Sequence, residues 1–306
     1  MNSMELSNYL EKIRYGRKLS QEDFVFGIVS IRQYQRYRRG ESEIPYEKLD
    51  QFAEKLGIPT KKLMAQFETE KNRQLNKVNE YYNSVATRNF KIAQKLYDDI
   101  KFDIIIDKET KVYFHHARLF HQFYEGKISK EILVPKTQKL INYPEILKQE
   151  YFTDIEILIM SSMLDFLELP KQDLLLRRLG ELFEQSDNIL SSQNDMTNSL
   201  ILMRLSNGYG MQGEFEKTIH FADLGIQRGI KFKQYYLFEN FFYYKALAHF
   251  KLEQYLEYEE TLFRCYNVLQ MEGNKRKIDR FTELIEKDFK INFHMFVMKY
   301  LQKEIM

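Results

Sequence analysis

Hydrophobic residues recur at spacings of three and four along most of the chain, and strict alternation of apolar and polar positions is nearly absent. This is the period of amphipathic α-helices, in which residues three and four apart share one face. The one short β-like run, DIIID at residues 103–107, has no second strand to pair with, so we interpret it as a connection. The pattern therefore predicts an all-α protein.

Residues 1–67 are predicted to form a domain of five helices around a small core. The first helix, residues 4–15, places Leu6, Leu10 and Ile13 on one face. The other four helices are expected at residues 21–26, 31–39, 45–56 and 61–67. Ser20 and Ser30 stand where they would cap the second and third helices, and Gly27 suits the tight turn between them.

The third predicted helix has an apolar face and a basic face. Tyr34 and Tyr37 lie three residues apart and are expected to pack in the core. The other face carries guanidinium and amide groups, from Arg32, Gln33, Arg36 and Arg39. A short basic helix that follows another helix through a tight turn fits the major groove of DNA.

Basic residues are concentrated in the same segment. Between Lys12 and Arg39 there are eight basic residues and two acids, a local balance of +6, whereas the whole chain carries +2. A solvated helix face can carry such a cluster too. Because it coincides with a predicted helix-turn-helix, we interpret it as a surface that faces phosphates.

Residues 5–67 resemble the helix-turn-helix domain of the Xre and lambda-repressor type. The resemblance rests on Arg14, the run LSQE at 19–22, Arg36, Gly40 and the closing apolar positions between 49 and 58. The run RRGESEI at 38–44 and the shortened turn resemble the Rgg regulators, which belong to the peptide-pheromone receptors together with PlcR and PrgX.

This resemblance implies roles in DNA binding for several residues. Gln21 matches a glutamine that contacts a phosphate and braces the recognition helix, and Arg32 and Gln33 lie where side chains reach base edges. The complete predicted set is Arg17, Lys18, Gln21, Ser30, Arg32, Gln33 and Arg36.

One position departs from the family pattern. Such domains pair the arginine of the first helix, here Arg14, with a glutamate two residues before the glycine, but this chain has Arg38 there. Two arginines cannot form an ion pair, so we expect Glu41 or Glu43 to substitute. Replacing Arg38 with glutamate is then expected to stabilise the domain.

The rest of the chain is predicted to form helical repeats, and a length of 306 residues favours two domains. Residues 68–79 are polar and read as a helical linker. Residues 80–306 resemble degenerate tetratricopeptide repeats, as the peptide-receptor resemblance also implies. The best pair of repeats is 202–224 and 242–264, at an offset of 40. Weaker hairpins are expected at 73–100, 110–142 and 151–188, with turns near Asn89, Gly126 and Lys171, and a final pair at 277–306.

Stacked hairpins curve, and the first helix of each pair lines the concave side. Polar residues predicted on those helices are therefore candidates for binding a peptide: Arg118, Gln122, Asn198, Arg204, Asn207, Asn240 and Tyr244. An asparagine amide pairs with a peptide backbone, and an arginine clamps a carboxylate. The alternative is that these side chains are exposed or cap neighbouring turns.

Nothing in the sequence indicates catalysis, a metal site or a cofactor. His115, His116 and His121 are not spaced to place three ligands on one helical face. Cys265 is the only cysteine, which excludes an intrachain disulfide, and its apolar neighbours indicate a buried thiol. No run of 18 apolar residues is present, so we expect a cytoplasmic protein with no membrane contact.

Together these features predict a homodimeric regulator that binds double-stranded promoter DNA and is controlled by a short linear signalling peptide in quorum sensing. The alternative is a repeat scaffold that binds a regulatory protein without DNA.

Overall fold

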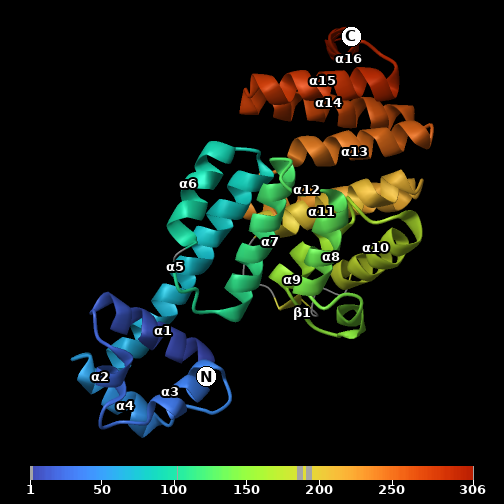
Figure 1. Ribbon diagram of the computed structural model, residues 1–306. Helices are drawn as coiled ribbons and strands as arrows, with labels where there is room; N and C mark the ends of the chain where they lie inside the picture. The colour runs from blue at the N-terminus through green and yellow to red at the C-terminus, as the bar shows by residue number, and fades with distance from the viewer. Residues whose placement is uncertain (1–2, 102, 185–188, 191–194, 306) are drawn as a thin grey trace. The chain divides into compact units, whose positions relative to one another are not determined.

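The structure, a computed structural model, describes residues 3–101, 103–184, 189–190 and 195–305 (Figure 1). The described chain is built almost entirely from α-helices, which confirms the predicted fold class. It forms two compact units, Met1–Leu140 and Ile141–Met306, which we call the first and the second unit.

The first unit begins with four short helices, as the sequence predicts. They are α1 (Ser3–Gly16), α2 (Gln21–Val25), α3 (Ile31–Arg38) and α4 (Tyr46–Lys55). The Ser20 hydroxyl accepts a hydrogen bond from the Asp23 amide at 2.9 Å and caps α2. Ser30 caps α3 in the same way, accepting from the Gln33 amide at 3.1 Å. Gly27, with φ of +78°, forms the turn between α2 and α3, a conformation that favours glycine.

Three aromatic rings hold these helices together. The Phe24 ring of α2 lies 5.0 Å from Phe52 of α4 and 5.8 Å from Tyr34 of α3, measured between centroids. All three side chains are fully buried, and Tyr37 is buried beside them. The prediction that both tyrosines belong to the core is therefore confirmed. Because each ring buries a large apolar area, this contact sets the position of α3 against α2 and α4.

Helix α5 (Thr60–Ala86) runs unbroken through the predicted fifth helix and the predicted linker. The expectation that a helix ends near residue 67 is therefore wrong. The segment contains no glycine or proline, so nothing interrupts its backbone hydrogen bonding. Residues 68–79 are helical, as predicted, and are part of this longer helix.

Two helical hairpins complete the first unit, with α5 packed against both α6 (Phe90–Ile100) and α7 (Lys108–Tyr124), and α7 against α8 (Lys130–Leu140). The predicted turns are confirmed: the Asn89 side chain caps α6, and Gly126, with φ of +73°, follows α7.

The connection between α6 and α7 is irregular, as predicted, and it packs on the helix-turn-helix core. Gln74 of α5 donates to the Ile104 carbonyl at 2.8 Å and accepts from the Ile106 amide at 2.9 Å. Ile106 is 1% exposed and belongs to the same apolar cluster as the residues of α1–α4. Lys12 of α1 forms an ion pair with Asp103. The predicted DNA-binding segment is thus fixed to α5 and to this connection by side-chain contacts.

The second unit contains eight further α-helices among its described residues, together with one short 3₁₀ helix and a pair of two-residue strands. The elements are η1 (Glu145–Lys148), β1 (Phe152–Thr153), α9 (Asp154–Met163), α10 (Leu169–Glu184), β2 (Ile189–Leu190), α11 (Asp195–Met211), α12 (Phe215–Phe232), α13 (Phe238–Lys251), α14 (Tyr255–Glu272), α15 (Lys275–Phe289) and α16 (Phe293–Ile305). Strands β1 and β2 pair in parallel, which the sequence pattern did not predict.

The predicted repeats are confirmed as hairpins α11–α12 and α13–α14, with turns at 212–214 and 252–254, and the final pair is α15–α16. The turn predicted near Lys171 is wrong, because α9 ends at Met163 and Lys171 lies inside α10. Pro170 sits in the first turn of α10, where its missing amide costs no helical hydrogen bond.

The hairpins of the second unit stack side by side, as α13 to α16 show in Figure 1. Helix α9 contacts α11, α11 contacts α13, and α13 contacts α15. We call these four helices the first-helix row. Gly225 of α12 allows a close approach of the Phe241 ring of α13, which a larger residue would block. The row matters for function because every predicted polar candidate of the second unit lies on it.

Candidate DNA-binding and ligand-binding sites

A buried carboxylate, Glu11 of α1, joins the helices of the helix-turn-helix. Glu11 is 5% exposed and accepts hydrogen bonds from Arg14 Nε at 3.1 Å, Gln21 Nε2 at 3.0 Å and the Tyr34 hydroxyl at 3.0 Å. Arg38 Nη1 lies 3.9 Å from the same carboxylate. We call these five side chains the Glu11 cluster. It connects α1, α2 and α3 through one acceptor.

The surroundings of Glu11 keep it ionised. Burial alone raises the pKa of the Glu11 carboxyl, but the hydrogen bonds from Arg14, Gln21 and Tyr34 and the charge of Arg38 outweigh it, so the pKa falls below its ordinary value. Burial also raises the pKa of the Tyr34 hydroxyl, which therefore remains a donor. A buried charge is tolerated only when it is paired and hydrogen-bonded, and here both conditions are met.

The expectation that Glu41 or Glu43 neutralises Arg14 is wrong. Arg14 pairs with Glu11, three residues earlier on the same helix, while Glu41 forms its closest ion pair, at 2.7 Å, with a different arginine. Arg38, which stands where the resemblance implies a glutamate, faces the same carboxylate. The acid that the resemblance places at the end of α3 is here supplied by α1. The acid therefore lies on α1 and an arginine lies at the end of α3, the reverse of the expected arrangement. The contact between an arginine and a carboxylate that joins these two helices is still present.

Gln21 links the Glu11 cluster to α3 a second time. Its Oε1 accepts a hydrogen bond from Gln35 Nε2 of α3 at 2.8 Å, while its Nε2 donates to Glu11. The predicted bracing of α3 by Gln21 is confirmed. Neither Glu11 nor Gln35 was among the predicted site residues, although the spacing of three between Glu11 and Arg14 was a usable signal.

The basic face of α3 is exposed. Arg32, Arg36 and Arg39 reach solvent, whereas Tyr34 and Tyr37 on the other face are buried. Within the part of the chain that the structure describes, Arg32 forms no side-chain hydrogen bond or ion pair. A guanidinium that is exposed and unpaired at the start of a helix is available to a base edge or a phosphate.

The other predicted residues of α3 hold one another in place. Gln33 donates to the Ser42 hydroxyl at 2.9 Å and accepts from Arg36 Nη1 at 3.4 Å. Arg36 also lies 3.9 Å from Glu41, at an exposed position where such a contact is weak. Ser30, exposed at the N-terminus of α3, uses its side chain as the cap. These contacts orient the amide and guanidinium groups on one surface.

Arg17 and Lys18 lie in the connection between α1 and α2. Arg17 donates to the Leu56 carbonyl and so braces the end of α4, although most of the residue is exposed. Lys18 is exposed and has φ of +59°. The structure therefore collects all seven predicted DNA-binding residues on α2, α3 and the connection before them.

The predicted peptide-binding residues divide between the two units. Asn198, Arg204, Asn207, Asn240 and Tyr244 lie on α11 and α13 of the second unit. Arg118 and Gln122 lie on α7 of the first unit, where Arg118 is exposed and placed 5.8 Å from the Tyr97 ring, and Gln122 is half-buried.

Arg204 is more buried than a groove residue is expected to be. It is 7% exposed, donates to the Ser161 hydroxyl at 3.1 Å and places Nε 3.5 Å from the Asp165 carboxylate. Helix α11 contacts α9, α10, α12 and α13, so few of its positions face solvent, and Asn198 is buried as well. Arg204 thus joins α11 to the end of α9.

Tyr244 and Asp165 are the more open members of the same neighbourhood. Asp165 follows α9, and its side chain is 39% exposed. Burial nevertheless raises the pKa of the Asp165 carboxyl, against the opposing effect of Arg204. Burial above all, together with the charges of Asp165 and Glu239 and against that of Arg280, raises the pKa of the half-buried Tyr244 hydroxyl to about 12.

The two asparagines differ in their surroundings. Asn207 is half-buried, with Nδ2 3.9 Å from the Met211 sulfur. Asn240 donates a hydrogen bond to the Glu239 carboxylate at 2.9 Å. Glu239 is 2% exposed and forms an ion pair with Lys277 of α15 at 2.9 Å. Asn240 therefore supports a contact between α13 and α15.

Other chemistry remains without a site in the described residues. No group of three or more His, Cys, Asp or Glu side chains is placed to hold a metal ion within the described ranges. The predicted burial of Cys265 is confirmed, and burial raises the pKa of its thiol. No helix among the described residues is long and apolar enough to cross a membrane.

No protein-family model matches the sequence, and no curated protein sequence matches it. Among solved structures, the chain is similar to ComR from Streptococcus thermophilus in complex with DNA and its signalling peptide: the TM-score is 0.51 at 16% identity, covering 88% of this chain and 94% of ComR. It is also similar to Bacillus thuringiensis PlcR in complex with the peptide PapR7 and DNA (TM-score 0.47, 15% identity, 89% and 98% covered). A third match is a single-substitution variant of the pheromone receptor Rgg2 from Streptococcus dysgalactiae (TM-score 0.45, 18% identity, 93% and 99% covered).

The similarity to ComR confirms the predicted resemblance at the level of the fold. The chain has the architecture of a helix-turn-helix domain followed by tetratricopeptide-like helical pairs, over nearly the full length of both proteins.

Proposed function

We propose that this protein is a sequence-specific DNA-binding transcription regulator controlled by a short linear signalling peptide. The observation that carries the proposal is the exposed basic face of α3. The Glu11 cluster fixes the position of this helix through contacts to its other side. Arg32 and Arg36 project from a helix whose opposite face is fixed by Tyr34 and Tyr37. Pre-positioned guanidinium groups on a short helix are suited to reading base edges in a major groove.

The proposal assigns DNA binding to residues 1–67, a helical linker to 68–79, and peptide binding with dimerisation to 80–306. The polar groups on the first-helix row support the second role, since an extended peptide needs donors and acceptors for its backbone. ComR, which shares the fold, was solved with DNA and its signalling peptide, and we extend both ligands to this chain.

A homodimer follows from the geometry of DNA reading. One domain of this size makes few base contacts, and two domains on half-sites one helical turn apart multiply the affinity. Peptide binding would then favour one arrangement of the two DNA-binding domains over another.

The alternative is a repeat scaffold that does not bind DNA. It assumed that the helix-turn-helix is degraded, because Arg38 stands where a glutamate is expected. The Glu11 cluster removes that argument, because Arg38 has a carboxylate partner and the core around α3 is complete.

A gel-shift experiment tests the proposal. The full chain is titrated against the region upstream of its own gene and against a scrambled duplex of equal length and composition. We expect tighter binding to the upstream region, with an affinity that falls steeply as salt rises. Equal binding to both duplexes, or none to either, would contradict the proposal.

A further inference from the structure

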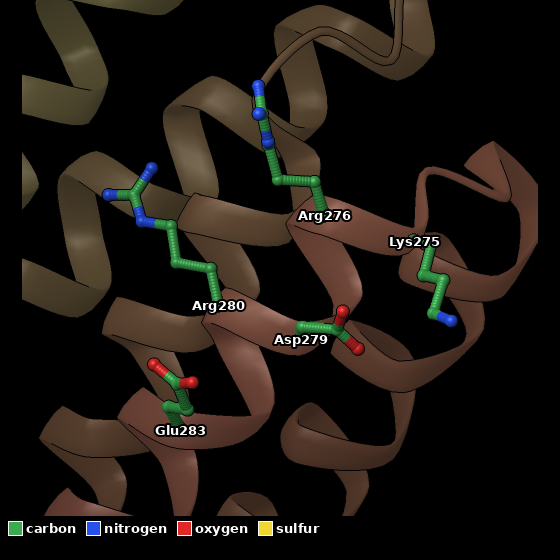
Figure 2. A pocket seen from close by; sticks show the side chains of 5 residues that line it. All are labelled: Lys275, Arg276, Asp279, Arg280 and Glu283. Atoms are coloured by element: carbon green, nitrogen blue, oxygen red, sulfur yellow. The ribbon is translucent and has the colours of Figure 1, made fainter.

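An open depression of about 560 Å³ against α15 gathers charged side chains of both signs: Lys275, Arg276, Asp279, Arg280 and Glu283 (Figure 2). Because two acids lie among three bases on one helix, the charge of this surface is nearly balanced and favours neither an anion nor a cation strongly. A polar surface selects a ligand when neighbouring contacts fix the direction of its donors and acceptors. Gln33 of α3, together with the turn after that helix, meets this condition.

The side-chain amide of Gln33 is held at both of its ends. Its Nε2 donates a hydrogen bond to the Ser42 hydroxyl at 2.9 Å, and its Oε1 accepts one from Arg36 Nη1 at 3.4 Å. Ser42 lies outside the helix, in the turn between α3 and α4, and both Gln33 and Ser42 are half-buried. The amide therefore joins the N-terminal part of α3 to the turn that follows the helix.

The direction of this amide follows from the chemistry of its two partners. A guanidinium group only donates hydrogen bonds, so the Gln33 atom beside Arg36 must be the oxygen. A flipped amide would place its NH₂ group against the donors of Arg36. The Ser42 hydroxyl can donate or accept, and it accepts from the nitrogen at the other end. Arg36 and Ser42 together therefore select one of the two orientations of the amide.

Each end of the Gln33 amide keeps capacity for a second contact. Its nitrogen carries two donors, of which Ser42 uses one, and its oxygen has two lone pairs, of which Arg36 uses one. Gln33 is the third residue of α3, and the N-terminal residues of the second helix of a helix-turn-helix are those that contact base edges. The amide thus offers one donor and one acceptor, in a fixed order, to a base.

One base has the matching pair of groups on its major-groove edge. Adenine presents N7 as an acceptor and its N6 amino group as a donor, and a glutamine amide can bond to both at once. Guanine presents two acceptors, N7 and O6, so the oxygen of a fixed amide would face another oxygen. An amide that is free to turn discriminates less, because it can direct its NH₂ group to either base.

We propose that Gln33 recognises an adenine in the DNA site and that Ser42 is the positioning residue that fixes the Gln33 amide for this contact. The inference rests on the proposed DNA-binding function. It adds the identity of one base and a residue outside α3 on which the choice of that base depends.

The first experiment selects bound sequences from duplexes with a randomised central segment, using the full chain. Wild-type protein and Gln33→Ala are compared, and the base pair at which only the variant loses its preference is the one that Gln33 reads. We expect adenine on one strand at that position, preferred over other bases roughly 5- to 150-fold, the range for a bidentate contact to a base.

A modified base tests the contact itself. 7-Deazaadenine lacks the N7 acceptor but keeps the amino group and the pairing with thymine. At the identified position of the selected duplex, it should weaken wild-type binding roughly 2- to 10-fold, the effect of one hydrogen bond, and should not weaken Gln33→Ala any further. An equal loss for both proteins would assign the preference to DNA shape and overturn the contact.

Two substitutions test the positioning role of Ser42. Ser42→Ala removes the hydroxyl and is expected to lower the preference for adenine at that position roughly 2- to 10-fold, while affinity for a scrambled duplex changes less than about twofold. Ser42→Thr keeps the hydroxyl and should keep the preference, which makes it the matched control. Thermal melts by circular dichroism verify that each variant is folded.

The outcomes separate this inference from the function beneath it. If the wild-type chain enriches no sequence, both the proposed DNA reading and the inference fail. If it enriches a sequence but the position read by Gln33 prefers a base other than adenine, DNA reading stands and the inference is overturned. The same holds if Ser42→Ala keeps the full preference, or if Ser42→Thr loses as much of it as Ser42→Ala.

Discussion

The arginine–carboxylate contacts at Glu11 and at Asp165 are built in opposite ways. Glu11 in the first unit is 5% exposed and accepts hydrogen bonds from three side chains, Arg14, Gln21 and Tyr34, with a second arginine 3.9 Å away. Asp165 in the second unit is 39% exposed at its side chain and has one arginine at 3.5 Å. The first carboxylate is saturated, and the second has lone pairs that remain open to solvent or to a ligand.

This difference appears in the two pKa values as well. The donors around Glu11 lower its pKa despite burial, whereas burial raises the pKa of Asp165 more than Arg204 lowers it. Removing one partner from a buried, saturated cluster is strongly destabilising, whereas a contact that water reaches contributes less. Glu11 therefore supports the position of α3, whereas Asp165 keeps acceptor capacity that its neighbours do not fill.

The largest effect expected from this comparison is that of Glu11→Ala. The substitution removes the shared acceptor and leaves Arg14 and Arg38 close together without a carboxylate. We expect a loss of about 3–5 kcal/mol in the local stability of α1–α4, the range seen when one partner of a buried pair is removed. Amide hydrogen exchange in the full chain measures it residue by residue.

Glu41→Ala is the matched control for that experiment. Glu41 is an exposed acid on the other side of the turn and pairs only at the surface, so its removal should cost no more than about 0.5–1 kcal/mol. Similar losses for the two variants would show that Glu11 is not the acceptor that organises the domain.

An intermediate effect is expected for Arg38→Glu. From the sequence, restoring the family glutamate is expected to stabilise the domain, but the structure reverses that expectation. The new carboxylate would face Glu11 and repel it, which we expect to cost roughly 1–3 kcal/mol. Arg38→Gln, which removes the charge without adding an acid, should cost less. A more stable Arg38→Glu variant in the same exchange experiment would argue against the contact between Arg38 and Glu11.

The smallest effect concerns pH, and its sign differs between the clusters. The folded-state pKa of Glu11 lies below its ordinary value of 4.5, so its stabilisation is present above that pH and is lost as pH falls through the folded-state pKa. The folded-state pKa of Asp165 lies above its ordinary value of 3.8, so ionisation costs stability as pH rises through that window. Asp165→Asn should therefore stabilise the second unit at pH 7 and have no effect well below pH 4.

Cys265 provides a built-in probe for this prediction. It is the only cysteine of the chain and is fully buried in the second unit. Its labelling by a disulfide reagent that reacts at acid pH reports the opening of that unit. At pH 7 we expect Asp165→Asn to be labelled more slowly than the wild type. The free energy of opening should rise by less than about 1 kcal/mol, because water screens a carboxylate that is 39% exposed. Faster labelling at pH 7 would show that the Asp165 charge is stabilising.

The fold was largely predictable because local signals mark the helix ends. Ser20 and Ser30 cap the helices that the sequence assigned to them, and Asn89 and Gly126 mark real turns. The break expected in α5 had no glycine or proline behind it and is absent. The pairing of β1 with β2 joins short segments far apart in the chain, and no local pattern announces such a contact.

The site was less predictable, because burial depends on neighbours that a helical period does not identify. Arg204 reads as a groove residue on one helix, yet four helices contact α11 and leave Arg204 7% exposed. Glu11 reads as a surface acid until α2 and α3 bring Gln21 and Tyr34 to it. The exposed face of α3 was predicted well because Tyr34 and Tyr37 fix which side of that helix is buried.

The measurement that tests the central claim most directly is a pair of DNA titrations with Arg32→Ala and Lys18→Ala. Arg32 lies at the exposed start of α3, and Lys18 lies in the connection between α1 and α2. On the upstream duplex, Arg32→Ala should cost about 1–3 kcal/mol and lose preference over the scrambled duplex. Lys18→Ala should weaken both duplexes alike and reduce the salt slope by about one. Equal, small losses on both duplexes for Arg32→Ala would contradict the claim that α3 reads DNA.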